Sequence, residues 1–519
     1  MFLIFLVIVF IIYSVYGVIN LHRNYSLTSF TRRIKTTDGT PLDKEVFEVG
    51  GIFGSNFELL SMDAEQKFEY FRQNASAFKR NYVQYYLRTP VLNIIDANDA
   101  ELVLNDPRLL SKGLGYKFLH PFIQTGLLTS DGEKWRSRRR LLLPTFNYNI
   151  LQQFVDIFKQ ESLNFVETLN THFKSEDNNA VILLNKLMPI LTLNNICETA
   201  MGVHLDDRLD CNEYRQHFAK IEKIFFERTT NPIMIFDFIY FKTRAGKNYL
   251  KTMETLHAFS SGIIEKRRKL LSDLEKSSEN SSIPNDEDMH YSKQRYVLLD
   301  SLLRAEKEGL IDHAGICEEV DTFVIAGSDT TAIGLIFAFM NLSLHPEVQQ
   351  KCYEEMQEHI SDDLSNLDMA NLAKLQYFNC VLKESQRLYP TAPYISRECS
   401  EDTVFKGNIL LPKGTQINIH IYDIHRSAKY YEEPEVFKPE RFLPEQRKNH
   451  PASAFFPFSA GLRSCIGEKF AMLEMKTLMV LVLKNFILEP ITYPDEIRCS
   501  IGVALRCSHD IKIKLRRRY

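Results

Sequence analysis

The residue best placed to do chemistry in this 519-residue chain is Cys465, because of what surrounds it. Residues 458–467 read FSAGLRSCIG, so Gly461 and Gly467 bracket the cysteine and Arg463 precedes it by two positions. Glycines allow a tight backbone turn and the close approach of a flat ligand. Residues 468–483 predict a helix, whose N-terminal amides and dipole favour a thiolate just before it. A lone cysteine is usually a buried, inert side chain, but this setting indicates a ligand for a metal.

A thiolate held in this way is a good axial ligand for haem iron. The pattern F-x-x-G-x-R-x-C-x-G, which begins at Phe458, resembles the haem-binding signature of the cytochromes P-450. The resemblance implies that Cys465 binds the iron of haem b (iron protoporphyrin IX). It also implies that Phe458, Gly461, Arg463 and Gly467 form the loop that binds the cofactor.

A second pattern provides a support for such a loop. Glu384 and Arg387 lie three positions apart on a predicted helix and therefore share a face. Taken alone, this is a surface ion pair of little energetic value. With Arg441 in the segment PERF (439–442), the pair resembles the E-x-x-R and P-E-R-F motifs of the same family. The resemblance implies a buried network that supports the segment presenting Cys465, and losing one partner would cost about 3–5 kcal/mol.

A third pattern, AGSDTT at residues 326–331, lies within a long apolar helix. Threonines in the middle of a helix can bend it when their hydroxyls bond backward, although such a pair is usually tolerated packing. Here the segment resembles the oxygen-binding kink of cytochromes P-450. The resemblance implies that Thr330 donates a hydrogen bond to dioxygen at the haem and that Asp329 relays protons.

A fourth pattern, KWRSRRR at residues 134–140, places Trp135 and Arg139 four positions apart on one helix face. In the family's W-x-x-x-R pattern these two residues contact haem propionates, and Arg397 matches another propionate ligand. Bidentate pairing of arginine with a carboxylate is the physical reason. The other cations would form a basic patch near the haem that steers an acidic electron donor: Lys134, Arg136, Arg138 and Arg140.

Further stretches from about residue 85 to the C-terminus resemble family 4 cytochromes P-450 in the insect style. Many family 4 members carry a glutamate just before the glycine of the oxygen motif, and it forms an ester to the haem. This chain has Ala326 there, and a methyl group cannot make that bond. We therefore expect haem held only by the bond to Cys465 and by non-covalent contacts.

The substrate side is less well defined. Residues 116–128 match the loop that the family places over the distal haem face, and residues 224–241 match its roof and access channel. The second stretch is rich in phenylalanine, including Phe236 and Phe238, and such stretches are more often core packing than a binding site. It could also dip into lipid. A lipophilic substrate that enters from the bilayer follows as a hypothesis.

The resemblance implies a monooxygenase that inserts one oxygen atom of O₂ into a lipophilic substrate with electrons derived from NADPH. Fatty acids, terpenoids, steroids and xenobiotics are all open as substrates. The implied electron donor is NADPH–cytochrome P-450 reductase, with cytochrome b5 as a second donor. The alternative is a haem-thiolate protein that binds a lipophile without turnover. Asp329, Thr330 and the basic patch favour the enzyme, since a binding protein needs none of them.

The elements that must position these residues are mostly helices. The sequence predicts a helix from an N-cap at Asp312 to Leu344, a second from 347 to 359 and a third from 371 to 389, which ends before Pro390. The C-terminal quarter contains short β-like pieces, such as the alternating residues 511–515. We therefore expect a mainly α protein with a smaller β portion, and the resemblance implies the cytochrome P-450 fold.

Composition agrees with one large globular enzyme. The formal net charge is −3 and the chain is 45% hydrophobic, which argues against a nucleic-acid-binding protein. Nine cysteines without a C-x-x-C pair fit neither a zinc module nor a disulfide framework. Reduced thiols on the cytosolic side of a membrane are the simplest account.

The first twenty residues contain no charged side chain, whereas Arg23, Arg32, Arg33 and Lys35 follow. An apolar run of this length nearly spans the ~30 Å hydrocarbon core, and the cations after it keep the body in the cytosol. A cleaved signal peptide is the alternative, but no cleavage site is clear. We expect a membrane anchor over 1–20, a linker over 21–55 and a catalytic domain over 56–519. The expected location is the endoplasmic reticulum membrane, the microsomal fraction, with the catalytic domain facing the cytosol.

Overall fold

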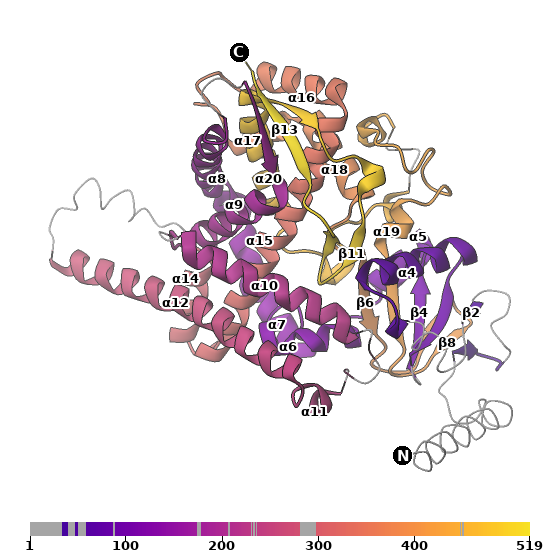
Figure 1. Ribbon diagram of the computed structural model, residues 1–519. Coiled ribbons are helices and arrows are strands. Elements are labelled where there is room, and N and C mark those ends of the chain that lie inside the picture. Colours follow the sequence, from indigo (N-terminus) through magenta and orange to yellow (C-terminus); the bar gives the residue numbers. More distant parts are fainter. Residues whose placement is uncertain are drawn as a thin grey trace, which may run out of the picture.

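The helices of the protein gather around α15, which runs from His313 to Leu344 through the middle of the molecule in the computed structural model (Figure 1). Asp312 caps its start by accepting a hydrogen bond from the backbone N–H of Gly315 at 2.8 Å. Its apolar residues lie all round rather than along one stripe, and almost every side chain is buried. This is the pattern of a core helix. Helices α9, α12, α18 and α20 and strand β10 pack against it.

The structure describes residues 34–39, 47–49, 59–86, 89–173, 178–205, 208–229, 231, 234, 236–280, 297–446, 448 and 451–518. The expected anchor at 1–20 lies outside these residues, as does most of the expected linker at 21–55. Within them, α15 is the one helix long and apolar enough to cross a membrane, and it is buried inside the protein.

Most of the remaining helices form a layered body around α15 (Figure 1). In chain order they are α4 (Ala64–Phe78), α5 (Ala97–Asn105), α6 (His120–Ile123), α7 (Gly132–Leu142), α8 (Tyr148–Asn170), α9 (Leu184–Thr199), α10 (Arg208–Thr229), α11 (Asp237–Tyr240), α12 (Arg244–Asn280), α14 (Leu298–Lys307), α16 (Pro346–His359), α17 (Met369–Lys374), α18 (Gln376–Leu388), α19 (Ile421–His425) and α20 (Glu468–Asn485).

Within the residues that the structure describes, the strands form four small sheets. The largest has the order β2-β3-β4-β9-β6, from Phe47–Val49, Tyr82–Tyr86, Thr89–Ile94, Gln416–His420 and Tyr394–Glu398. A second, β10-β13-β5, joins Phe486–Pro490, Lys512–Arg517 and Asn179–Leu183. A third, β1-β8-β7, joins Lys35–Thr36, Ile409–Leu411 and Thr403–Phe405. The fourth is the hairpin of β11 (Cys499–Ile501) and β12 (Leu505–Cys507).

Two hydrophobic cores result from this arrangement. The larger lies among the helices around α15, and the smaller lies between the five-stranded sheet and α5, where Leu92, Val103 and Ile417 are buried. The protein is thus mainly helical with a smaller sheet portion, as the sequence predicts.

The helices predicted from the sequence are present in the structure, except that one of them is interrupted. The helix expected from 371 to 389 is two helices, α17 and α18, which meet at Leu375 in a non-helical backbone conformation. The sequence also predicts a polar surface loop around residues 277–293; α12 continues to Asn280, and the rest of that stretch lies outside the described residues.

Candidate functional site

Cys465 lies in a tight loop directly before α20. Its backbone N–H donates to the carbonyl of Phe458 at 2.9 Å, and the N–H of Ser464 donates to the carbonyl of Gly461 at 3.1 Å. Gly461 has φ +69°, and a Cβ placed there would lie 2.1 Å from the carbonyl oxygen of Leu104 in α5. Glycine is therefore required at this turn.

Gly467 serves the loop differently. Its φ of −95° suits any residue, so the turn itself does not require glycine here. A Cβ at Gly467 would lie 4.0 Å from Sγ of Cys465, beside the sulfur rather than against the backbone. The missing side chain leaves the sulfur open to a flat ligand.

The Cys465 side chain is accessible in the structure. Surrounding protein nevertheless raises the pKa of its thiol through burial, while a hydrogen bond from Gly467 and the charges of Arg139 and Lys112 act in the opposite direction. The sulfur thus has positive charge and a backbone donor next to it, and these groups stabilise a thiolate once a metal takes the proton's place.

The predicted cations gather around this loop. Trp135 is buried, and the guanidinium carbon of Arg463 lies 4.3 Å from its ring centroid. Arg139 donates to the carbonyl of Ser464 at 3.0 Å, which ties α7 to the cysteine loop. Arg463 itself donates to protein oxygens, including the Asp131 carboxylate at 2.6 Å, and burial lowers its pKa to about 10.

Arg397 and Lys112 show that the site has more positive than negative charge. Arg397 is 1% exposed, and the one described hydrogen bond of its guanidinium goes to the carbonyl of Ser396. Burial, Arg397, Arg463 and Arg139 hold the pKa of Lys112 well below its ordinary value, and Asp131 opposes this. The carboxylates of a porphyrin would balance these charges, so the residues present fit a haem. Lys112 was not predicted, since contacts with distant segments bring it here: a β-bridge to Arg397 and a backbone hydrogen bond to Asp131 at 3.1 Å.

On α15, two side chains are exposed within an otherwise buried stretch, Ala326 and Thr330, which lie one turn apart. The hydroxyl of Thr330 donates backward to the carbonyl of Ala326 at 2.6 Å. The carbonyl of Thr330 accepts from the hydroxyl of Thr391 at 3.3 Å. These bonds compete with the helix ladder where the sequence predicts a kink.

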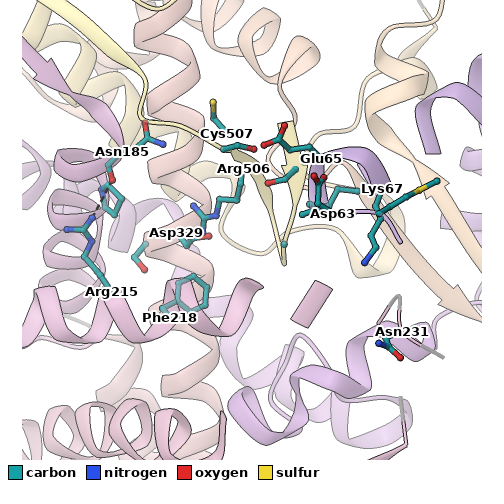
Figure 2. Close-up of a pocket in the computed structure, with 18 of the residues that line it drawn as sticks. Asp63, Glu65, Lys67, Asn185, Arg215, Phe218, Asn231, Asp329, Arg506 and Cys507 are labelled. Carbon is teal, nitrogen blue, oxygen red and sulfur yellow. Dashed lines mark hydrogen bonds and ion pairs between the residues drawn. The ribbon is translucent and has the colours of Figure 1, made fainter. Parts of the chain in front are cut away.

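Asp329 lies on another side of the same turn. Its carboxylate accepts from Nη2 of Arg506 on β12 at 2.5 Å, and it is 7% exposed. Both residues line a cavity of about 960 Å³ between α4, α9, α10, α15 and the β11–β12 hairpin (Figure 2). Arg506 was not predicted, because nothing in its local sequence indicates a partner 177 residues away.

The expected network of Glu384, Arg387 and Arg441 is present. Both nitrogens of the Arg387 fork donate to the Glu384 carboxylate at 2.8 Å, and both side chains are 0% exposed. Nε of Arg441 lies 3.3 Å from Glu384. Arg387 also donates to the carbonyls of His425, Pro434 and Val436, so the network holds the backbone that leads toward Cys465.

His425 extends this network to the cysteine loop. Its Nε2 accepts a hydrogen bond from the backbone N–H of Phe456 at 3.0 Å. Burial, assisted by the Arg387 charge, lowers the pKa of His425 to about 3, so the imidazole is neutral and able to accept. His425 was not predicted from the sequence, since it lies outside the recognised motifs.

The predicted basic patch is wrong for Arg138, which is buried and lies 3.7 Å from Glu319. Lys134 is exposed and pairs with Glu318 at 2.7 Å. Both cations tie α7 to α15. Arg136 pairs with its neighbour Glu133, and Arg140 is exposed.

The phenylalanine-rich stretch, residues 224–241, has both exposed and packed aromatic side chains in the structure. Phe236 and Phe238 are 45% and 68% exposed. Tyr240 and Phe241, in contrast, pack around the buried guanidinium of Arg228. Core packing therefore accounts for only part of this stretch.

Comparisons with known proteins agree with this geometry. The family model described as Cytochrome P450 matches residues 48–513. Cytochrome P450 4p1 of Drosophila melanogaster is 48% identical over 506 residues, 96% of this chain and 97% of that protein. Probable cytochrome P450 4ac3 of the same organism is 43% identical over 96% of each chain. Cytochrome P450 4V2 of Homo sapiens is 35% identical over 83% of this chain and 81% of its own. The chain therefore belongs to the cytochrome P450 family, most similar to its insect family 4 members, and is a haem-thiolate monooxygenase.

Proposed function

We propose that the protein inserts one oxygen atom of O₂ into a C–H bond of a lipophilic substrate, with electrons from NADPH delivered by NADPH–cytochrome P-450 reductase. The observation that carries the proposal is the pair Ala326 and Thr330, which are the accessible side chains of a buried stretch of α15. A binding protein needs an apolar wall there, whereas oxygen chemistry needs a hydroxyl that donates a hydrogen bond.

The haem, when bound, supplies the dioxygen chemistry, and the chain holds it. In this proposal Cys465 would be its iron ligand, and Trp135, Arg139, Arg397 and Lys112 would hold its carboxylates. Arg463 acts indirectly, because its guanidinium is bonded to protein oxygens and fixes the cysteine loop. The cofactor is haem b.

Asp329 is proposed to pass protons toward Thr330. It lines the cavity of Figure 2 and directly precedes Thr330 on α15, and Arg506 holds its carboxylate at the cavity wall. A cavity of this size admits water, and a carboxylate next to water can exchange protons with it.

Replacing Thr330 by alanine should uncouple NADPH use from product formation. Positioned proton transfer contributes about 10²–10⁴ in rate, so we expect product formed per NADPH to fall by about tenfold or more while peroxide rises. Thr322→Ala is a matched control, since its hydroxyl makes the same backward bond, to Glu318 at 2.7 Å, in a buried position. Product, peroxide and NADPH are measured together. Coupling that survives in Thr330→Ala would contradict the assignment, and wild-type protein that never forms product would favour a lipophile-binding protein.

We expect the haem to leave the polypeptide on acid treatment. Ala326 offers no carboxylate for an ester at the position where relatives of the family carry glutamate. Acidified acetone or butanone extraction should therefore transfer all porphyrin to the organic phase. Porphyrin that remains with the precipitated chain would contradict non-covalent binding.

We propose that the protein is anchored in the endoplasmic reticulum membrane by residues 1–20, faces the cytosol and takes its substrate from the lipid. The exposed rings of Phe236 and Phe238 support a second contact with the bilayer. Cytochrome b5 is the other proposed electron donor. The exposed Arg140 and Leu143, beside the contact of α7 with Ser464, offer either donor a docking face.

Changing Phe236 and Phe238 to serine should weaken membrane association of a chain that lacks residues 1–20. Apolar surface that leaves water contributes about 25 cal/mol per Å², so removing each ring weakens membrane binding by a part of that free energy. Vesicle flotation compares this variant with one in which the exposed Leu310 and Val404 are changed instead. Equal binding of both variants would show that the two rings do not contact lipid.

A further inference from the structure

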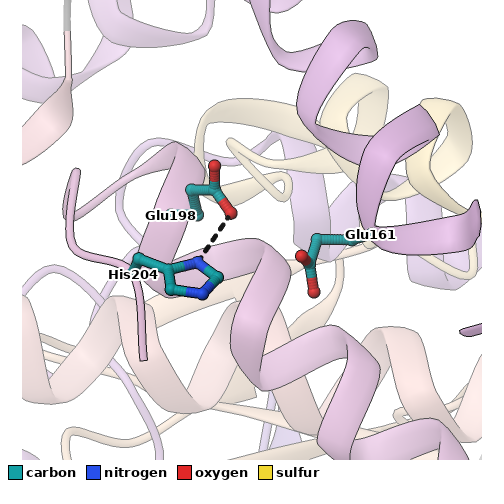
Figure 3. A group of neighbouring side chains, drawn as sticks. All are labelled: Glu161, Glu198 and His204. Atoms are coloured by element: carbon teal, nitrogen blue, oxygen red, sulfur yellow. Dashed lines mark ion pairs between the residues drawn. The ribbon is translucent and has the colours of Figure 1, made fainter. Parts of the chain in front are cut away.

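Three side chains of the kinds that bind metals lie together outside the haem site (Figure 3). Glu161 comes from α8, Glu198 from the last turn of α9, and His204 from the segment between α9 and α10. One ligand atom from each lies within 4.8 Å of the others. The three side chains point into one common space in Figure 3.

The charges in this cluster are unbalanced. Glu161 is 5% exposed and accepts hydrogen bonds from two amides, Asn164 Nδ2 at 3.1 Å and Asn194 Nδ2 at 3.4 Å. Among the described residues, neither Glu161 nor Glu198 has an ion pair with a lysine or an arginine. A carboxylate out of water beside a second carboxylate is costly unless a cation lies between them.

The described cations near the cluster form no ion pair with either carboxylate, although Lys266 donates to the backbone carbonyl of His204 at 3.0 Å. Arg267 approaches the segment but donates to the carbonyl of Gly202 and to the Asp300 carboxylate. Nδ1 of His204 lies 3.5 Å from Glu198, longer than the about 2.7–2.9 Å of a charge-assisted hydrogen bond. The carbonyls at the C-terminal end of α9 add further negative potential, which attracts a cation.

We propose that Glu161, Glu198 and His204 bind a divalent metal ion, with Zn²⁺ as the best match. The two carboxylates balance the charge of the ion, the imidazole adds a nitrogen ligand that suits zinc, and a fourth position is left for water. Zinc bonds of about 2.0–2.2 Å place ligands about 3.3–3.6 Å apart, so small side-chain rotations complete the site. His204 and Glu198 are partly exposed, which gives the ion a path in.

A metal here would join α8, α9 and the segment that leads into α10. Since α9 packs along α15, the site would fix the outer side of the helix layer that supports Thr330 and Asp329. The proposed role is structural and does not depend on the proposed oxygen chemistry.

The test uses the haem-loaded full chain, stripped with EDTA and then exchanged into metal-free buffer. Zinc chloride is added, and bound zinc is measured by equilibrium dialysis with elemental analysis. The wild type should bind one zinc ion per chain tightly. The variants His204→Gln, Glu161→Gln and Glu198→Gln should each weaken zinc binding by at least about tenfold. His172→Gln, an exposed histidine just after α8, should retain it. Zinc held elsewhere, for example by Cys317 beside His313, persists in every variant and is subtracted.

Thermal unfolding gives a second test. If these side chains only packed together and bound no metal, the unfolding temperature would not depend on zinc. Zinc should raise the midpoint of the wild type and leave His204→Gln unchanged. Without metal, Glu161→Gln should be at least as stable as the wild type, because it removes the repulsion with Glu198. The proposal is overturned if the wild type and the three variants bind the same amount of zinc with the same affinity, because that result indicates an adventitious ion only. It is equally overturned if the wild type retains none.

Discussion

Replacing Glu384 by alanine is expected to destabilise the folded protein by about 3–5 kcal/mol, because Arg387 would remain buried without its carboxylate. Both side chains are 0% exposed, so water cannot take the place of the missing group. Arg441 would lose the same partner. The two arginines also hold the carbonyls of Pro434, Val436 and Glu433, so the segment before the cysteine loop should loosen as well.

Unfolding by urea, followed by haem absorbance and circular dichroism, measures the change. Glu133→Ala is the control, since it removes an exposed partner of Arg136 and should have little measurable effect. Glu384→Gln keeps a hydrogen-bond acceptor and should lose less than the alanine variant. A Glu384→Ala protein as stable as Glu133→Ala would show that the network does not support the fold.

Replacing Cys465 by alanine is expected to reduce product formation to the level without enzyme. The thiolate is the electron-rich ligand that favours cleavage of the O–O bond, and a methyl group cannot replace it. Fold stability should change little, because the side chain is accessible rather than packed into the core. Cys352→Ala is the matched control: that thiol is buried in α16, burial raises its pKa well above the ordinary value, and its loss should leave turnover intact. Comparable turnover in the two variants would contradict the role of Cys465.

Much of the candidate site could be predicted from the sequence, since its residues lie in short motifs. The residues from Phe458 to Gly467 form one loop, Glu384 and Arg387 share one helix face, and Thr330 bonds one turn back. In each case the interaction depends on spacing along the chain, which a sequence displays directly. Gly461 is the clearest example, because its positive φ follows from the turn that the motif requires.

The parts that were missed depend on contacts between distant segments. Lys134 and Arg138 resembled an exposed patch, yet Glu318 and Glu319 of α15 lie opposite them. Lys112 joins the site through its β-bridge to Arg397 and its hydrogen bond to Asp131, and Arg506 joins it through the β11–β12 hairpin. Periodicity shows which residues share a face, but not which element covers that face.

The fold also divides into parts that follow from local sequence signals and parts that depend on contacts between distant segments. The start of α15 follows from the cap at Asp312, and the start of α16 follows from Pro346. The break at Leu375 carries no proline or glycine, so no local signal marks it. The five-stranded sheet joins segments more than 300 residues apart, such as β4 and β9, and long-range pairing of this kind is set by the packed core.

The absorption spectrum of the reduced protein with carbon monoxide is the most direct test of whether Cys465 binds haem iron through a thiolate. We predict the red-shifted Soret band of thiolate ligation in the wild type and in Cys352→Ala, and its loss in Cys465→Ala. A wild-type protein that takes up no haem when haem is plentiful would contradict the account. So would a red-shifted band that persists in Cys465→Ala.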